Sequence, residues 1–361
     1  HDKTQLRTLD GSRVISNNRS PAPIPRGGTS VAKPSRNNAR PVNSNVEALI
    51  LHQTMSNRFS AGPAAVLMAA ALALAACGAQ QKADAVAALP EYRAFGEPQL
   101  VAIRGYQGDA MEPFITKDGR YLLFNNRNDP KIDTRLLFAE RVDDLTFDYR
   151  GELEGANTRA LEGVPSMDRH GNLFFVSTRS YAETLSTIYR GRFGQGRVSG
   201  IDLVAGISLR QRGMVTFDAE VSADGSTLFV ADGRFAGGHV PETADIDIAV
   251  RDGAGFRRLP AARDLLRNVN TAALEYAPAV SGDLLELFFT RLEGSGRSPR
   301  SAILRAVRPD AGAPFGAPQR LASITGFVEA PALSGDGRAL YYHRLDGGRF
   351  VILRVARSIR P

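Results

Sequence analysis

The sequence has 361 residues and a formal net charge of +7. The positive surplus lies upstream, because residues 1–77 carry 9 of the 45 basic and 3 of the 38 acidic residues, which leaves 36 basic and 35 acidic residues after Cys77. A nucleic-acid-binding face needs a basic surplus, so we expect no nucleic-acid partner. The single cysteine excludes an intramolecular disulfide, and the absence of tryptophan disfavours a carbohydrate site.

Residues 1–54 are rich in Asn, Ser, Arg and Pro, contain no methionine and show no hydrophobic periodicity. This composition is typical of a disordered segment. A signal-like sequence follows it, and signal peptides are N-terminal, so we expect translation to begin at Met55 and residues 1–54 to be a spurious upstream extension. The alternative is a genuine disordered arm, which would block export as a lipoprotein.

Residues 55–76 predict a lipoprotein signal peptide. Arg58 supplies a short basic region, and Ala64–Ala75 is an apolar run too short for a comfortable membrane span. The run ends in Leu-Ala-Ala-Cys, which resembles the lipobox of bacterial lipoproteins, and this resemblance implies lipidation of Cys77. The alternative for Cys77 is a buried free thiol.

The expected location is therefore the bacterial cell envelope. A lipid on Cys77 would anchor the chain, in the outer membrane, so that it faces the periplasm, and this lipid would be its only contact with the membrane. Residues 77–91 are rich in small residues and are expected to form a tether between the anchor and a folded domain that spans residues 92–361.

The folded region repeats one sequence phrase five times. The copies begin 52, 54, 59 and 53 residues apart, at Pro113, Pro165, Ala219, Pro278 and Pro331. A nearly fixed period of this size marks a repeat architecture. Each copy continues with a tight turn, often Asp-Gly, then an apolar run and an arginine. The turn favours a type I′ hairpin, and the opening proline fits the first residue of a strand.

The first four copies each predict four strands, which is the content of one propeller blade. In the first copy, the apolar run 121–124 is the second strand, and residues 136–140 and 147–153 are the third and fourth. The fifth copy stops near Val355 without a fourth strand, while the upstream segment Phe95–Leu100 resembles Phe315–Leu321. We therefore expect an all-β propeller of five four-stranded blades, six being possible, in which the N-terminal strand completes the last blade and removes an open sheet edge.

The phrase resembles the WD40-like repeat of the TolB propeller family, which runs roughly proline, serine, proline-aspartate-glycine, apolar run, arginine. The resemblance covers residues 95–355. The sequence departs from the pattern before Asp-Gly, where Lys117, Arg169, Ala223 and Gly335 stand in place of proline. The resemblance implies a propeller and a role as an envelope scaffold, but propellers host binding proteins and enzymes alike.

One acidic residue precedes each phrase and one arginine ends it. The acids, which we expect to gather at one mouth of the channel, are Glu112, Glu162, Asp218, Glu275 and Glu329. The repeat arginines are Arg127, Arg179, Arg234, Arg291 and Arg344. Five carboxylates could hold a cationic group or act as an acid and a base, since like charges push pKa values apart. The structural alternative, which we favour, pairs the acids with arginines, and we expect this for at least three of the five.

The sequence gives little support to a metal or cofactor site. The histidines and the single cysteine show no metal-ligand spacing, and neither a nucleophile elbow nor a phosphate loop is present. We expect no metal, no cofactor and no catalytic residue.

Three functions remain open. The leading prediction is a non-catalytic lipoprotein that binds an envelope protein or peptide on its longest loops, at residues 128–134, 235–244 and 292–301. The alternative is an enzyme resembling five-bladed glycosidases, with paired carboxylates in the channel. The third is a sensor of a small molecule or a metal ion. Unpaired carboxylates lining an open pocket would distinguish the enzyme from the scaffold.

Overall fold

The structure is a computed structural model that describes residues 91–128, 133–237, 240–294 and 299–360. The chain divides into two compact units, residues 1–85 and 86–361, and every described residue belongs to the second. The predicted upstream extension, the signal peptide, Cys77 and nearly all of the tether lie outside the described residues. No helix in the described part is long and apolar enough to cross a bilayer.

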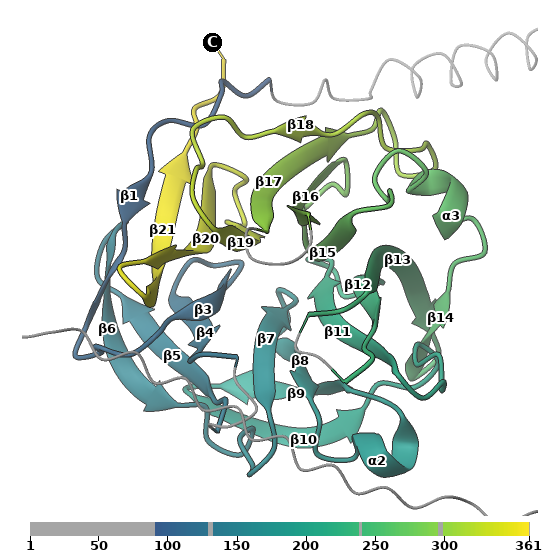
Figure 1. The fold of residues 1–361 in the computed structure, drawn as a ribbon. Helices are drawn as coiled ribbons and strands as arrows, with labels where there is room; N and C mark the ends of the chain where they lie inside the picture. Colours follow the sequence, from purple (N-terminus) through teal and green to yellow (C-terminus); the bar gives the residue numbers. More distant parts are fainter. Residues whose placement is uncertain (1–90, 129–132, 238–239, 295–298, 361) are drawn as a thin grey trace, which may run out of the picture. The chain divides into compact units, whose positions relative to one another are not determined.

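The described chain forms antiparallel blades around a central axis (Figure 1). The first blade contains β3 (Met111–Ile115), β4 (Tyr121–Asn125), β5 (Leu136–Arg141) and β6 (Thr146–Glu152). The second contains β7 (Glu162–Met167), β8 (Asn172–Ser177), β9 (Ile188–Gly194) and β10 (Arg197–Leu203). The third contains β11 (Met214–Val221), β12 (Thr227–Arg234), β13 (Thr243–Asp252) and β14 (Gly255–Arg258). Short helical turns follow β8 and β14, at α2 (Tyr181–Thr184) and α3 (Ala262–Leu265).

The last two blades have the same order. The fourth contains β15 (Leu274–Val280), β16 (Glu286–Glu293), β17 (Arg300–Val307) and β18 (Gln319–Arg320). The fifth contains β19 (Val328–Leu333), β20 (Ala339–Asp346), β21 (Arg349–Ala356) and, from the N-terminal side, β1 (Gln99–Leu100). The hydrogen-bonded pairing of the described strands thus gives one group of four strands for each copy of the phrase, and the first group gains one more strand from the N-terminal side. A single parallel bridge between Ala244 and Leu274 links the third group to the fourth.

The N-terminal strand closes the ring as predicted. Gln99 lies opposite Arg354 and Leu100 opposite Leu353, so β1 covers the outer edge of β21. The chain then crosses to the first blade, where β2 (Ala102–Arg104) pairs in parallel with β6. The N-terminal segment therefore joins the two ends of the repeat array. The all-β propeller and its closing strand are confirmed.

The apolar core lies between neighbouring blades. One buried cluster joins the first and second blades, and further clusters join the second to the third, the third to the fourth, the fourth to the fifth and the fifth to the first. Buried aromatic and aliphatic residues of the apolar runs, such as Phe124, Phe175 and Phe289, supply these clusters. Each blade therefore depends on both neighbours for burial, as expected of a repeat architecture.

Two local predictions are wrong. The opening prolines do not begin strands, because Pro113, Pro165, Pro278 and Pro331 lie inside β3, β7, β15 and β19, where the strand register shifts. A bulge tolerates proline because its residue needs no ladder hydrogen bond. The Asp-Gly turns are not type I′, because only the glycine has a positive φ, for example 73° at Gly119. The aspartate instead accepts hydrogen bonds, as Asp118 does from Thr116 Oγ1 at 2.5 Å and the Arg120 amide at 3.0 Å.

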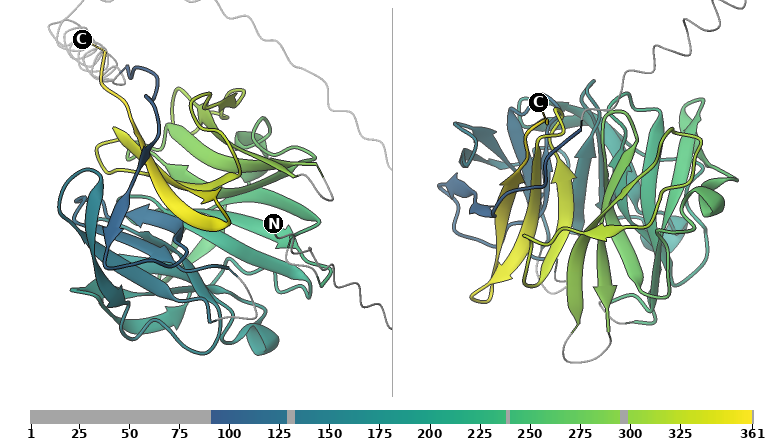
Figure 2. Two further views of the ribbon diagram at one scale, coloured as in Figure 1. Left: turned by 60° about the vertical axis from the view of Figure 1, so that its left-hand side comes forward. Right: turned by 90° about the horizontal axis from the view of Figure 1, so that it is seen from above.

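The two ends of the ring carry different loops. At one end lie the turns between the first and second strand of each blade, together with the chain's described termini. At the other end the innermost strands begin and the second strands end, and β16 and β17 extend in that direction (Figure 2). We call this second end the channel mouth; the predicted contact loops belong to it, although parts of all three lie outside the described residues.

Candidate functional site: the central channel

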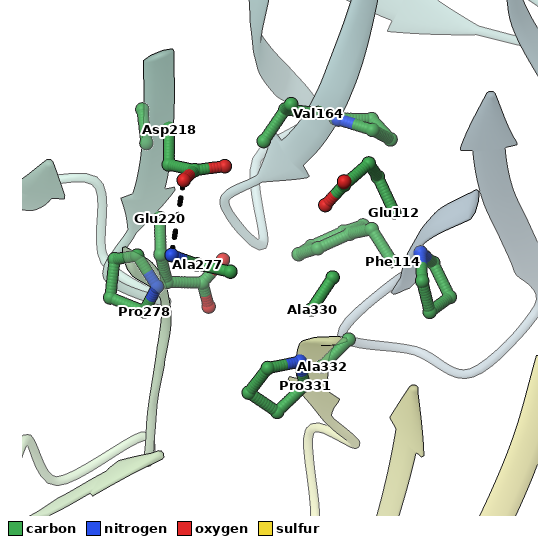
Figure 3. A pocket seen from close by; sticks show the side chains of 13 residues that line it. Glu112, Phe114, Val164, Asp218, Glu220, Ala277, Pro278, Ala330, Pro331 and Ala332 are labelled. Atoms are coloured by element: carbon green, nitrogen blue, oxygen red, sulfur yellow. Dashed lines mark hydrogen bonds between the residues drawn. The ribbon is translucent and has the colours of Figure 1, made fainter. Parts of the chain in front are cut away.

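Each blade contributes two consecutive residues of its innermost strand to a narrow central channel (Figure 3), and in all blades but the third these lie at the bulge. The lining pairs are Glu112-Pro113, Val164-Pro165, Asp218-Ala219, Ala277-Pro278 and Ala330-Pro331. Phe114, Glu220 and Ala332 complete the wall. The cavity has a volume of about 30 Å³, which is close to the share of one molecule in liquid water.

The bulges impose an unusual backbone conformation on non-glycine residues. The φ angle is 50° at Glu112, 54° at Val164, 50° at Ala277 and 56° at Ala330, a region that such residues occupy at a cost. Hydrogen bonds to the preceding blade offset this cost. The bulge amides donate to His343 Nδ1 at 3.1 Å, Asn125 Oδ1 at 3.0 Å, Asp218 Oδ2 at 3.0 Å and Thr290 Oγ1 at 3.0 Å. In the third blade, the Val221 amide donates to Ser166 Oγ of the second blade at 3.0 Å, so these bonds run around the whole ring.

Three acidic residues line the cavity (Figure 3). Glu220 is paired with Lys117, whereas Glu112 from β3 and Asp218 from β11 have no basic partner at salt-bridge distance among the described residues. Burial raises the pKa of Glu112 to about 8, and the charges of Asp218 and Glu329 reinforce the rise while His343 opposes it. Burial also raises the pKa of Asp218 to about 8, although the Ala277 amide lowers it. Burial therefore favours the protonated form of both carboxyl groups.

Glu329 is not among the residues that line the cavity. Its carboxylate accepts hydrogen bonds from Tyr276 Oη and, at 3.2 Å, pairs with His343 Nε2. Burial lowers the pKa of His343, but the hydrogen bond to Glu329 and the charge of Glu112 together raise it by more. The pKa of His343 is therefore raised overall. The Glu112 amide donates to Nδ1, which requires an unprotonated Nδ1, so this contact fixes the Nε2–H tautomer of the neutral ring.

Glu162 and Glu275 are locked in matching ion pairs. Arg179 Nη2 lies 3.2 Å from Glu162 Oε1, and Arg291 Nε lies 2.6 Å from Glu275 Oε1. Both carboxylates are 0% exposed. Threonine completes each site, because the amide and hydroxyl of Thr158 donate to Glu162 at 2.8 and 2.7 Å, and those of Thr271 donate to Glu275 at 2.9 and 2.6 Å.

A short sequence motif that was not predicted encodes these locks. Residues 157–162 read Asn-Thr-Arg-Ala-Leu-Glu and residues 270–275 read Asn-Thr-Ala-Ala-Leu-Glu. Asn157 bonds both backbone groups of Leu136 in the first blade, and Asn270 bonds both of Ile246 in the third. The asparagine thus fastens the preceding blade while the threonine and glutamate hold the arginine. The recurrence of this hexapeptide was the available signal.

The other repeat arginines have different surroundings. Arg127 bonds Asp109 at 2.9 and 3.1 Å rather than Glu112. Arg344 contacts Asp346 at 3.2 Å on the surface. Arg234 is exposed.

The five predicted acids therefore do not share one position. Counted back from the first residue of each phrase, Glu112 and Asp218 stand one residue before it, Glu329 two residues, and Glu162 and Glu275 three residues. The first two reach the cavity, Glu329 interacts electrostatically with both, and the last two are fixed by arginine and threonine. We expected an arginine partner for at least three of the five acids. Among the described residues, two of the acids, Glu162 and Glu275, have one.

At its other end the channel has a separate ion pair. Lys117 Nζ lies 3.1 Å from Glu220 Oε1, and Ser166 Oγ donates to Glu220 Oε2 at 2.5 Å. Both charged side chains are largely buried. Across the described ranges, no group of histidine, cysteine and acidic side chains has the arrangement of a metal site.

Loss of Glu275 is expected to destabilise the domain by about 3–5 kcal/mol, because it leaves the Arg291 guanidinium unpaired beside buried backbone. Urea unfolding of Glu275→Ala measures this. Glu154→Ala is the matched control, since its ion pair with Arg197 is more than two-thirds exposed on both sides and should cost less than about 1 kcal/mol. Similar losses for both variants would contradict the assigned lock.

Comparison with known proteins adds a likeness of fold. No protein-family model matches the chain, and no curated protein does. Among solved structures, TolB from Acinetobacter baumannii is 13% identical with a TM-score of 0.38, and the match covers 70% of this chain but only 55% of TolB, about half its length. A family 117 glycoside hydrolase from Zobellia galactanivorans is 12% identical with a TM-score of 0.47, covering 73% of this chain and 90% of the hydrolase. A thermostable family-43 glycoside hydrolase is 14% identical with a TM-score of 0.44, covering 74% and 98%.

Proposed function

We propose that this protein is a non-catalytic binding propeller, anchored in the bacterial envelope through Cys77, which presents its channel mouth to a periplasmic protein or peptide. The observation that carries this proposal is the size of the channel. A cavity of about 30 Å³ is roughly a tenth of the smallest usual ligand pocket, so a sugar ring does not fit between the carboxyl groups.

The protonation of these groups also argues against the glycosidase alternative. An acid–base pair needs one protonated and one ionised carboxyl group, with pKa values pushed apart by their environments. Glu112 and Asp218 both have a pKa raised to about 8 by burial, so neither is a ready base at neutral pH. The remaining acids hold hydrogen bonds within the scaffold, which assigns them to stability rather than to turnover.

The course of the chain supports presentation of the channel mouth. The described N-terminus enters beside the C-terminus, where Tyr92 bridges to Ile359 and the Arg360 amide donates to the Glu91 carbonyl at 2.6 Å. This entry lies at the end of the ring that carries the β19–β20 turn, opposite the channel mouth. A lipid tether upstream of Glu91 would leave the channel mouth turned away from the membrane. The envelope address, the lipid and the absence of a nucleic-acid partner remain part of the proposal.

Photo-crosslinking in a Gram-negative host tests the proposal. A photoreactive amino acid replaces Arg234 at the channel mouth or Arg338 at the opposite end, both of which are exposed, in a chain that begins at Met55. We expect a discrete crosslinked adduct from position 234 and none from position 338. The protein should be found in the membrane fraction, and Cys77→Ala should remove it from that fraction. Hydrolysis of a glycan by wild-type protein that Glu112→Gln abolishes would overturn the proposal, as would an acyl-free Cys77 in the mass spectrum.

A further inference from the structure

A second, larger cavity lies where the fourth and fifth blades meet the N-terminal segment. Its volume is about 440 Å³, which is within the range of small-molecule sites. Tyr92, Leu285, Val307 and Pro309 give it apolar surface, and Val307 is 45% exposed. The charged wall consists of Glu91, Asp283, Glu286, Arg305, Arg308 and Arg360.

Arg308 occupies a position that recurs in neighbouring blades. Its Nε donates to the Leu284 carbonyl at 2.8 Å, as Arg251 Nε does to Gly225 at 2.9 Å and Arg357 Nε to Gly337 at 2.7 Å. The guanidinium of Arg308 also lies 4.4 Å from the centre of the Phe315 ring. These contacts fix the orientation of its plane, so the group is held ready to form hydrogen bonds.

The turn that holds Arg308 is unusual among the repeats. The other four turns have glycine at this position with φ between 71° and 80°, whereas Leu284 has a φ of 65°. A leucine in this conformation is strained. Its side chain packs against the apolar cluster between the third and fourth blades, which offsets part of the cost.

The charge of Arg308 is left without the partner that its equivalent has. Arg357 of the fifth blade bonds Glu286 of the fourth blade through both terminal nitrogens. The position that corresponds to Glu286 in the third blade is Thr227, because Glu286 lies opposite Val307 and Thr227 opposite Val250, the residues before Arg308 and Arg251. Threonine cannot neutralise an arginine, so the preceding blade offers Arg308 no carboxylate at this position.

The other charges of the cavity wall are already paired. Glu286 contacts Arg305 as well as Arg357, and Arg360 contacts Glu91 at 3.3 Å. Asp283 accepts hydrogen bonds from Ser281 Oγ at 2.5 Å and the Leu285 amide at 3.0 Å within its own turn.

Arg308 is only 5% exposed, and its Nη1 has no hydrogen-bond partner among the described residues. Nη1 is completely buried. An unpaired buried cation is destabilising unless an anion meets it. Burial accordingly lowers the pKa of Arg308, although the charge of Asp310 raises it.

We propose that this cavity binds a small organic acid, whose carboxylate is received by Arg308 and whose apolar body lies against Tyr92, Leu285 and Val307. A carboxylate accepts a charge-assisted hydrogen bond from a guanidinium N–H, and Nη2 is the nitrogen that is neither completely buried nor bonded to Leu284. The site lies at the opposite end of the ring from the channel mouth and does not depend on the function proposed for that surface.

Calorimetry and thermal unfolding of the full chain test this site with 4-phenylbutyrate, its uncharged amide and inorganic phosphate. We expect phenylbutyrate to bind and, at 100 times its dissociation constant, to raise the melting temperature by about 5 °C. The amide should bind at least 10-fold more weakly. Equal binding of acid and amide would overturn the proposal, and so would phosphate binding as tight as that of phenylbutyrate, which would indicate an anion site without an apolar subsite.

Variants separate binding from folding. Arg308→Met should abolish the response to phenylbutyrate while leaving the melting temperature of the free protein unchanged or higher, because it removes an unpaired buried charge. Arg308→Lys keeps the charge but loses the guanidinium plane that Leu284 and Phe315 hold in place, and should weaken binding at least 10-fold. Arg263→Met, the same change at an exposed arginine, should alter nothing. Retained binding in both Arg308 variants would contradict the assignment.

Discussion

Deletion of residues 91–101 is expected to unfold the propeller or to leave it aggregated. The segment hydrogen-bonds along the edge of the fifth blade, where the amides of Arg93, Gly96 and Val101 donate to carbonyls of residues 358, 356 and 352 at 2.8–2.9 Å. Phe95 packs edge-on against Phe288, with ring centres 5.9 Å apart. Its removal opens a sheet edge, which invites association with other chains.

The size of this effect follows from the side chains that lose cover. Val101 is 6% exposed and belongs to the cluster between the fifth and first blades. Arg357 lies 3.6 Å from the Tyr92 ring centre and 4.8 Å from that of Phe95. Burial of each large apolar side chain contributes about 1.5–3 kcal/mol, so the loss amounts to roughly 5 kcal/mol or more, which is comparable with the whole stability of a small domain.

Gel filtration and thermal unfolding measure this outcome, with a chain that begins at Glu91 as the control. Two neighbouring substitutions refine it. Val101→Ala should lower the free energy of unfolding by about 1–3 kcal/mol, whereas Leu100→Ala should have little effect because Leu100 is 61% exposed. A deletion variant that stays monomeric with an unchanged melting temperature would show that closure by β1 does not stabilise the ring.

Much of this fold could be predicted because the same sequence pattern occurs in each of the five repeats. The match between Phe95–Leu100 and Phe315–Leu321 was enough to predict the closing strand. The last blade lacks its fourth strand, and an unpaired N-terminal strand can take that position. The continuation of the chain into β2 was not predicted. Its three residues pair in parallel with β6, and no periodicity develops over so short a segment.

The candidate site was harder to predict because bulges change which way a side chain points. One inserted residue at Pro113 or Pro331 shifts the strand register, so acids one, two or three residues before the phrase reach different places. Sequence spacing alone could not separate Glu112, which faces the cavity, from Glu275, which is held by Arg291. The unpaired state of Arg308 was also out of reach, since it depends on Thr227 in another blade.

The stability of the protein is expected to fall as the pH rises from about 5 to about 8. Asp218 and Glu112 have pKa values near 8 in the folded protein, raised chiefly by burial, against about 4 in the unfolded chain. The folded state therefore holds more protons than the unfolded state in this window, and each extra proton lowers the free energy of unfolding by roughly 1.4 kcal/mol per pH unit. His343, whose pKa is also raised on balance, contributes in the same direction above about pH 6.5.

Urea unfolding at pH 5, 6, 7 and 8 measures this slope, and Asp218→Asn is the decisive variant. Asparagine keeps an oxygen that can accept the hydrogen bond from the Ala277 amide, but it takes up no proton. The free energy of unfolding of the variant should therefore depend less steeply on pH, by up to the contribution of one proton. The variant should also be more stable than wild type at pH 8. Asp252→Asn is the matched control, because its side chain is 64% exposed in a surface ion pair, and its profile should follow that of wild type. A flat wild-type profile would refute the raised pKa values, and an unchanged slope in Asp218→Asn would assign the protons elsewhere. The expected result would show that the folded ring holds these channel carboxyl groups in the neutral form, and that keeping them buried costs stability as the unfolded chain ionises, a loss that levels off above about pH 8.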